Sequence, residues 1–364
     1  MARKHAQHGA RRAGGRPGAA TACAADELDR VPAETSEPST AEPPTTAEIQ
    51  TNPVSGPITV PYRVELGDSG VEVHSLGLST GALDRGADAH AADLLDRFAG
   101  LGGDLIAVAD GPAAPVGGER VVGAWLASRG TRDRVRLMTR VRCSPGPARP
   151  TTRTITDAVD ASLGRLGTDR IDLLAFHDDD PETPLEEILG ALDALLASGK
   201  VLALAAAGCS PERLIQARVL AADGLPRFQA LATPYHLLAR RGFEGALGVV
   251  ARAQGLAVLP QSPLAGGVLG RRLHRRGEPR DATAARHQHR AGRRATRVLR
   301  VLGEVADAHG TDPAAVAVAW LLARPAVAAP VVAVRRPDQV DALMRAASLV
   351  LTRSELVELD RASA

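Results

Sequence analysis

The chain has 364 residues, of which 45% are hydrophobic and 24% charged, and its formal net charge is +2. This length can bury one large core or two modest ones, and the near-neutral charge argues against general nucleic-acid binding. The sequence contains no run approaching the roughly 18 to 20 apolar residues of a membrane-spanning helix, so we expect no membrane contact.

The N-terminal segment and the cysteines predict an intracellular protein with a tail. Residues 1–60 are rich in Pro, Ser, Thr, Ala and Glu, and so bury too little apolar surface to offset the entropy lost on ordering. We therefore predict a disordered tail over 1–60, either simply solvated or docking a partner, and a folded unit over 61–364. The odd, widely spaced Cys23, Cys143 and Cys209, and the lack of a secretory signal, indicate a reducing, cytoplasmic location.

From residue 60 onward, short apolar runs alternate with amphipathic segments. Tyr62–Leu66 and Val71–Val73 flank the turn sequence Gly67-Asp68-Ser69-Gly70 and predict a hairpin. Eight further runs are expected to be strands. They are Ser75–Leu78, Leu105–Ala109, Val135–Val141, Ile171–Phe176, Val201–Ala207, Phe228–Ala232, Leu256–Leu259 and Pro330–Val334.

Helical segments lie between these strands, and two carry clear start signals. Thr183-Pro184-Leu185 reads as a capping residue followed by a proline at the first helical position, and Ser210-Pro211-Glu212 reads the same way. Eight strands that alternate with helices predict a closed (β/α)₈ TIM barrel opening with a hairpin. A doubly wound open sheet is the alternative, but the glycines of Gly77-Leu78-Ser79-Thr80-Gly81 have the wrong spacing for its nucleotide fingerprint.

Five separated motifs resemble those of the aldo-keto reductase family, and the resemblance covers residues 60–364. The motifs are Ile171-Asp172-Leu173-Leu174-Ala175-Phe176-His177, Pro184-Leu185-Glu186-Glu187, Ser198-Gly199-Lys200-Val201, Leu259-Pro260-Gln261-Ser262-Pro263-Leu264-Ala265-Gly266-Gly267, and the set Val316–Leu322, Pro330–Arg335 and Gln339. The resemblance implies a barrel that uses NADPH, without a metal, to reduce small-molecule aldehydes and ketones.

The family's four catalytic residues are an Asp, a Tyr, a Lys and a His at strand ends, and only the histidine is matched here. By the resemblance, Ala107 stands at the aspartate position, Pro112 (or its neighbour Ala113) at the tyrosine position, Arg140 at the lysine position, and His177 at the histidine position. The tyrosine donates the proton, so losing it predicts a rate lower by roughly 10² to 10⁴. The planar guanidinium of arginine is not equivalent to a lysine ammonium.

The chain's few tyrosines and lysines lie elsewhere in the sequence. They are Tyr62, Tyr235, Lys4 and Lys200. Asp110 is a poor substitute for the missing aspartate because it follows that position by three residues.

The cofactor positions implied by the resemblance divide into two groups. Ser262, Leu264 and Gly266 keep the phosphate loop after the seventh strand, Arg335 matches the residue that pairs with the ribose 2′-phosphate, and Gln339 matches an adenine contact. The positions that differ from the family are Ala207 and Gly208 in place of Ser-Asn, Ala232 in place of Gln, Gln261 in place of an aromatic residue, and Leu343 in place of Asn. Most of these changes fall at the end where hydride moves, so NADP(H) is the expected cofactor, held through its phosphates.

Residues 271–297 form an arginine-rich segment with ten arginines and three histidines against two acids. It is interpreted as an anion clamp, a dock for polyanions, or a solvated insertion. Without interleaved aromatic residues to stack on bases, we do not expect nucleic-acid binding.

Other clusters carry weaker signals. The histidines His274, His287 and His289 match no zinc spacing, so no metal site is predicted. Cys209 at a helix start lacks a histidine partner in sequence, and Asp178–Asp180 read as a solvated rim.

Three functional hypotheses follow. The first is an aldo-keto reductase-like barrel that is catalytically impaired or inactive but still binds NADP(H). The second is an active NADPH-dependent carbonyl reductase with a rearranged site built on His177 and Arg140. The third is a polyanion-binding module that acts through residues 271–297.

Overall fold

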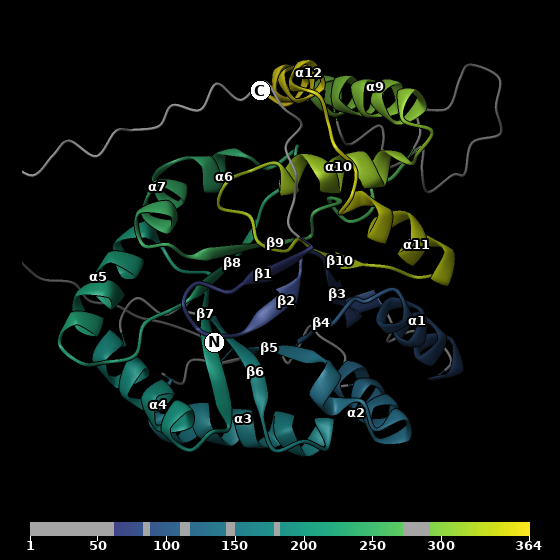
Figure 1. Cartoon of the computed structure of the whole chain (residues 1–364). Coiled ribbons are helices and arrows are strands. Elements are labelled where there is room, and N and C mark those ends of the chain that lie inside the picture. Colours follow the sequence, from purple (N-terminus) through teal and green to yellow (C-terminus); the bar gives the residue numbers. More distant parts are fainter. Residues whose placement is uncertain (1–61, 83–87, 110–116, 143–149, 178–182, 272–291) are drawn as a thin grey trace, which may run out of the picture. The chain divides into compact units, whose positions relative to one another are not determined.

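The computed structural model describes residues 62–82, 88–109, 117–142, 150–177, 183–271 and 292–364. The predicted tail over 1–60 and most of the arginine-rich segment lie outside these residues. Eight parallel strands close into a barrel in which the last strand pairs with the first (Figure 1). The strands are β3 (Gly77–Ser79), β4 (Leu105–Ala109), β5 (Arg136–Arg142), β6 (Ile171–His177), β7 (Val201–Ala207), β8 (Ala230–Pro234), β9 (Ala257–Gln261) and β10 (Val331–Ala333). The predicted (β/α)₈ barrel is confirmed.

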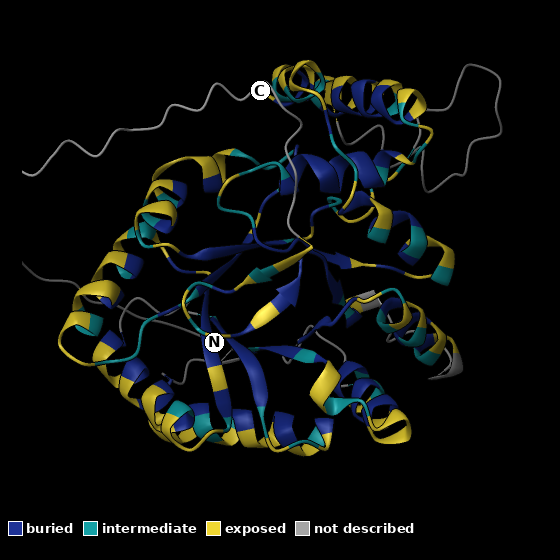
Figure 2. Cartoon of the chain, viewed as in Figure 1, coloured by how far each residue is buried: buried dark blue, intermediate teal, exposed yellow. Residues whose placement is uncertain are grey.

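Helices surround the strands, and Figure 2 shows their buried residues facing the barrel and their exposed residues facing outward. The helices are α1 (Asp88–Gly100), α2 (Gly117–Arg129), α3 (Thr152–Leu166), α4 (Leu185–Ala197), α5 (Pro211–Ala222), α6 (Arg241–Glu244), α7 (Ala246–Ala253), α9 (Gly292–Ala308), α10 (Pro313–Leu322), α11 (Pro337–Ala346) and α12 (Arg353–Ser363). None of these helices is long and apolar enough to cross a membrane.

The predicted hairpin is present and covers one end of the barrel. β1 (Arg63–Glu65) pairs antiparallel with β2 (Glu72–His74). The buried Leu66, Val71 and Val73 pack among the side chains inside the barrel. The hairpin is also hydrogen-bonded to the start of a barrel strand: the backbone N–H of His74 donates to the carboxylate of Asp104, which directly precedes β4, at 2.7 Å. The hairpin therefore closes the amino-terminal end and leaves the carboxyl-terminal end as the mouth.

Small side chains line most of the barrel interior. Among the buried interior residues are Ala107, Ala175, Ala203, Ala205, Ala207, Ala230, Ala232 and Ala257. Barrels of this class usually fill these layers with branched side chains. Here the apolar groups of the hairpin join the interior cluster from one end, and the larger strand side chains in it are Leu105, Met138, Leu173, Leu259 and Val331.

A buried ion pair fixes β6 against the start of β5. The Asp172 carboxylate accepts from the Arg132 guanidinium and from the backbone N–H of Leu137, at 2.7 and 2.8 Å. Breaking such a pair on one side costs about 3 kcal/mol or more, because the remaining charge stays desolvated.

Several predicted boundaries shift by one or two residues. β5 runs to Arg142 and β9 to Gln261, beyond the apolar runs that predicted them, because strand pairing continues through polar residues at the mouth. α5 begins as predicted, with the Ser210 hydroxyl accepting from the backbone N–H of Arg213 at 3.2 Å. The prediction of Thr183 as the cap of α4 is wrong by one position, since Pro184 occupies the cap and α4 starts at Leu185.

His74, the last residue of β2 in the hairpin, is fully buried. Its Nδ1 accepts from the backbone N–H of Leu76 at 2.9 Å, which requires the neutral ring. The Tyr62 ring contacts it edge-on, with centroids 4.4 Å apart. Burial lowers the pKa of His74 below its ordinary value of 6.5, and the nearby Asp104 charge opposes this only in part.

We predict that His74 makes the fold acid-labile. Below pH 6.5 the unfolded chain protonates this histidine, whereas the folded chain keeps it neutral until a lower pH. The stability that His74 contributes is therefore present above pH 6.5 and is lost as the pH falls below it. His74→Asn keeps an acceptor for Leu76 but cannot titrate. Urea unfolding at pH 7, 6 and 5 should therefore show a smaller loss of unfolding free energy in the variant than in the wild type.

The comparison variant is His236→Asn at the other end of the barrel. Burial and the Arg294 charge also lower the pKa of His236. The variant His236→Asn should therefore remove a separate share of the pH dependence of stability. Equal pH slopes for His74→Asn and the wild type would refute the assignment to His74.

Candidate active site and nucleotide groove

The alternation of side chains along the strands places three of the expected site positions on one face. Met138 and Ala175 belong to the interior cluster, so Arg140 and His177, two residues further along β5 and β6, face the same way toward the mouth. Both side chains are half-buried. Ala107 faces the interior on β4 and is 7% exposed. The structure thus brings Arg140, His177 and Ala107 onto the inner face of three consecutive strands.

The residues expected at the tyrosine position lie outside the described part of the chain. Pro112 and Ala113 belong to 110–116, as does Asp110, and Asp178–Asp180 belong to 178–182. Their assignment stays a prediction. Both tyrosines of the chain, Tyr62 and Tyr235, lie within the described residues.

Neither tyrosine lies beside His177. Tyr62 is at the hairpin end, where its hydroxyl donates to the carbonyl of Leu101 at 3.0 Å. Tyr235 follows β8 but is 1% exposed, and its hydroxyl donates to the Glu244 carboxylate at 2.8 Å. Burial and that carboxylate raise the pKa of Tyr235 far above its ordinary value. Both phenols are therefore committed to structural contacts.

Lys200 is also distant from the mouth. It directly precedes β7, at the amino-terminal end of the barrel, and its Nζ binds the Asp160 carboxylate at 2.6 Å. The only other lysine, Lys4, lies outside the described residues.

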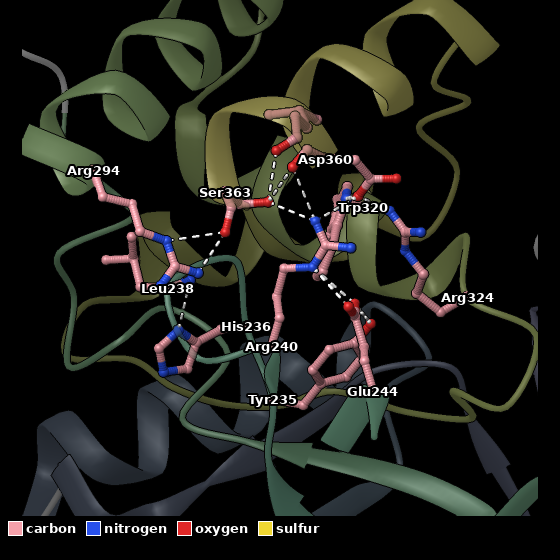
Figure 3. A network of polar contacts seen from close by, with 11 residues as sticks. Tyr235, His236, Leu238, Arg240, Glu244, Arg294, Trp320, Arg324, Asp360 and Ser363 are labelled. Carbon is pink, nitrogen blue, oxygen red and sulfur yellow. Dashed lines mark hydrogen bonds and ion pairs between the residues drawn. The ribbon is translucent and has the colours of Figure 1, made fainter. Parts of the chain in front are cut away.

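Tyr235 belongs to a polar network that fastens the segment after β8 to the C-terminal helices (Figure 3). Arg240 binds Glu244 at 2.8 Å and donates to Ser363 Oγ at 2.8 Å. The Asp360 carboxylate accepts from the Trp320 indole at 3.0 Å and from Arg324, whose guanidinium lies 4.2 Å from the indole centroid. This network holds Tyr235 in the wall of the protein.

The His177 ring packs against the backbone at Gly208. A β-carbon added to Gly208 would lie 2.9 Å from both Cε1 and Nε2 of the imidazole, and the residue has φ +69°. A larger residue at this position therefore has no room while His177 keeps this place. The contact was not foreseen from the sequence, since it depends on the left-handed turn after β7.

A groove of about 540 Å³ lies beside the loop after β9. Its lining includes Ser262, Leu264, Gly266, Arg271, Arg335 and Gln339. All five residues expected to bind the cofactor thus meet in one cavity. Asp312 and Asp338 contribute negative charge to its rim, but Asp338 is paired with Arg336 at 2.9 Å.

The loop after β9 has a strained backbone that presents N–H groups. Ser262 and Ala265 are non-glycine residues with φ of +54° and +52°. Within the described chain the N–H of Ala265 donates to a backbone carbonyl of the loop, whereas those of Leu264 and Gly266 donate to no backbone acceptor. Left-handed residues among right-handed ones form concave anion sites, and such strain persists where structure or function requires it.

The structure gives Gln339 a role in capping α11. Its Oε1 accepts from the backbone N–H groups of Arg335 and Arg336 at 2.9 and 3.2 Å. The side chain thereby orders the turn that carries Arg335 into the groove. The signal was present in the sequence as a glutamine three residues after the cap position, which is the capping-box spacing.

Arg271 is a groove residue that the cofactor assignment from sequence missed. Its Nη1 is buried and has no hydrogen-bond partner among the described residues. A buried guanidinium nitrogen is costly to leave unpaired, so an anionic ligand is the natural partner. Sequence reasoning placed Arg271 only within a run of ten arginines.

The comparisons with known proteins agree with this architecture. The model of the Aldo/keto reductase family matches residues 75–364. Norsolorinic acid reductase stcV of Emericella nidulans is 30% identical over 73% of this chain and 70% of its own length. Protein tas of Escherichia coli is 28% identical over 80% and 94%, and the uncharacterized oxidoreductase YrpG of Bacillus subtilis is 31% identical over 65% and 75%. The chain belongs to the aldo-keto reductase family of oxidoreductases.

No group of three or more His, Cys, Asp or Glu side chains within the described ranges is arranged to hold a metal ion. The histidines of 272–291 lie outside those ranges. Cys209, which precedes α5, is buried and packs into the hydrophobic layer outside the barrel.

We predict that Gly208→Ala destabilises the fold through His177. The matched control is Gly199→Ala, which has a similar φ of +73° but no atom within 4 Å of the added carbon. Gly199→Ala should cost about 1 kcal/mol of unfolding free energy for its backbone conformation alone. Gly208→Ala should cost about 1 to 3 kcal/mol more, from the close contact.

The double variant His177→Ala/Gly208→Ala removes the ring that the new methyl group meets. Denaturant unfolding of the wild type, His177→Ala, Gly208→Ala and the double variant should therefore show a favourable coupling between the two positions. Equal costs for Gly208→Ala and Gly199→Ala would disprove the contact.

Proposed function

We propose that this aldo-keto reductase-family barrel binds NADP(H) through its phosphates and adenosine and has severely reduced carbonyl reductase turnover. The observation that carries the proposal is the commitment of both tyrosines to structural hydrogen bonds away from His177. The proposal also includes a cytoplasmic location, and a division of the chain into a tail over 1–60 and one folded unit over 61–364.

The reaction of the family needs a hydride, a proton and support for a developing alkoxide. NADPH supplies the hydride when it is bound. The protein must supply a positioned acid and charges that favour proton transfer. Here Ala107 contributes only a methyl group. Arg140 contributes a positive charge, but its planar guanidinium does not reproduce the compact ammonium of a lysine. His177 is the remaining group able to move a proton, so a slow residual rate is expected.

The fit of the cofactor is best at the phosphate end. The N–H groups of Leu264 and Gly266 and the guanidinium groups of Arg271 and Arg335 would hold phosphate oxygens. The lining carries three arginines, Arg271, Arg335 and Arg336, against the two carboxylates Asp312 and Asp338, and Arg271 Nη1 has no hydrogen-bond partner among the described residues. A positively charged groove with unpaired donors supports binding of a phosphorylated nucleotide.

An active reductase that uses His177 and Arg140 is the alternative, favoured by their common orientation toward the mouth. The polyanion-binding hypothesis is less well supported. Of the arginines in 271–297, Arg294 and Arg297 donate to the last carbonyls of α12, at 2.9 and 3.0 Å, and so serve to anchor that helix.

We predict that NADPH oxidation with a panel of reactive aldehydes and ketones runs at least about 100-fold below that of an active family member assayed in parallel. His177→Ala should lower this residual rate further, by about tenfold or more, because His177 is the remaining group able to move a proton. A family-like rate that falls by about 100-fold or more in His177→Ala would establish the alternative.

We predict that Arg335→Ala and Arg271→Ala each weaken NADP⁺ binding by about tenfold, because each loses a charge-assisted hydrogen bond. Arg345→Ala, an exposed change on the same helix α11 as Gln339, should bind as the wild type does. Isothermal titration calorimetry gives the three affinities. Undiminished binding in both groove variants would place the nucleotide elsewhere.

A further inference from the structure

We propose that His90 on α1 is a positioning residue for Arg335, and that this contact strengthens the preference of the protein for NADP(H) over NAD(H). His90 is not among the residues that line the groove, and it lies on the first helix of the barrel, 245 positions before Arg335 in the chain. The inference rests on the proposed NADP(H) binding and adds a specificity-determining residue to it.

The imidazole of His90 holds the backbone of Arg335. Its Nε2 lies 2.7 Å from the carbonyl oxygen of Arg335. A carbonyl oxygen can only accept, so this nitrogen carries a hydrogen and donates it. The distance is at the short end of the range for N–H···O bonds. His90 therefore links α1 directly to the turn that leads from β10 into α11.

Both peptide groups that flank the Cα atom of Arg335 are held by side chains. The Oε1 atom of Gln339 accepts from the N–H groups of Arg335 and Arg336 at 2.9 and 3.2 Å. His90 binds the carbonyl of the same peptide group whose N–H belongs to Arg336. Because a peptide group is planar, holding both groups fixes φ and ψ of the residue between them. The direction in which the side chain of Arg335 leaves the backbone is therefore set before any ligand arrives.

The helix that carries His90 is a rigid support. α1 packs against α11 (Figure 1), and buried side chains of both helices belong to one apolar cluster. These side chains include Ala91, Leu94, Leu95, Val340 and Leu343. A second polar contact between the helices joins Arg97 to Asp341 at 2.8 Å. That contact ties helix to helix, whereas His90 ties α1 to the turn before α11.

Holding Arg335 in place favours one of the two nicotinamide dinucleotides. The 2′-phosphate is the group that NADP(H) has and NAD(H) lacks, and Arg335 is its proposed partner. A guanidinium that is ordered before binding loses less conformational entropy when it pairs with a phosphate. NAD(H) makes no such pair and gains nothing from this order. The contribution of His90 should therefore appear in the ratio of the two affinities.

Isothermal titration calorimetry of the full-length protein with NADP⁺ and NAD⁺ tests this role. His90→Ala should weaken NADP⁺ binding by about fivefold, as expected for the loss of one hydrogen bond, and leave NAD⁺ binding within about twofold of the wild type. His90→Gln keeps an N–H donor of similar reach, so its NADP⁺ affinity should return to within about twofold of the wild type. The matched control is Arg97→Ala, which removes the other polar contact between α1 and α11 and should keep the wild-type ratio of affinities.

The double variant His90→Ala/Arg335→Ala separates positioning from a direct contact with the ligand. If His90 acts through Arg335, adding His90→Ala to Arg335→Ala should change NADP⁺ affinity by less than about twofold. An unchanged NADP⁺ affinity in His90→Ala, or equal losses for NADP⁺ and NAD⁺, would overturn the inference and leave the proposed NADP(H) binding intact. The same holds for a full effect of His90→Ala in the Arg335→Ala background. If the wild type fails to bind NADP⁺, the proposed function fails as well.

Discussion

The closed ladder of eight parallel strands is the constraint on which the site depends. Because β10 pairs with β3 and side chains alternate along each strand, the inward face of every strand end is fixed by register. Arg140 and His177 face the mouth for this reason, and Ala107 occupies an equivalent inward position on β4. The closed ladder thus places an alanine, an arginine and a histidine on the inner face of three neighbouring strands.

The two ends of the expected cofactor site have different physical characters. Beside the loop after β9, strained backbone, unpaired N–H groups and two guanidinium groups surround a cavity. At the strand ends, methyl groups predominate and the one imidazole packs on glycine. A ligand that spans both ends would be held at one end only, and this asymmetry underlies the proposed loss of turnover with retained nucleotide binding.

Much of the fold could be predicted from the sequence because it depends on local periodicity. The hairpin, eight strands and the start of α5 at Ser210 follow from alternation, turn residues and capping signals. The contact of His177 with Gly208 could not be predicted, since it depends on a turn conformation and a side-chain position set by tertiary packing. Arg271 was concealed among similar residues, and only its burial in the groove distinguishes it.

The alanines of the barrel interior leave space in which larger side chains could be introduced. Methyl groups inside a closed barrel impose few steric demands on larger neighbours, and the closed ladder fixes the direction in which each strand residue points. Gly208 is the exception, because the imidazole already fills its space. A larger side chain at position 208 would thus require His177 to move or change first, whereas the alanine positions carry no such requirement.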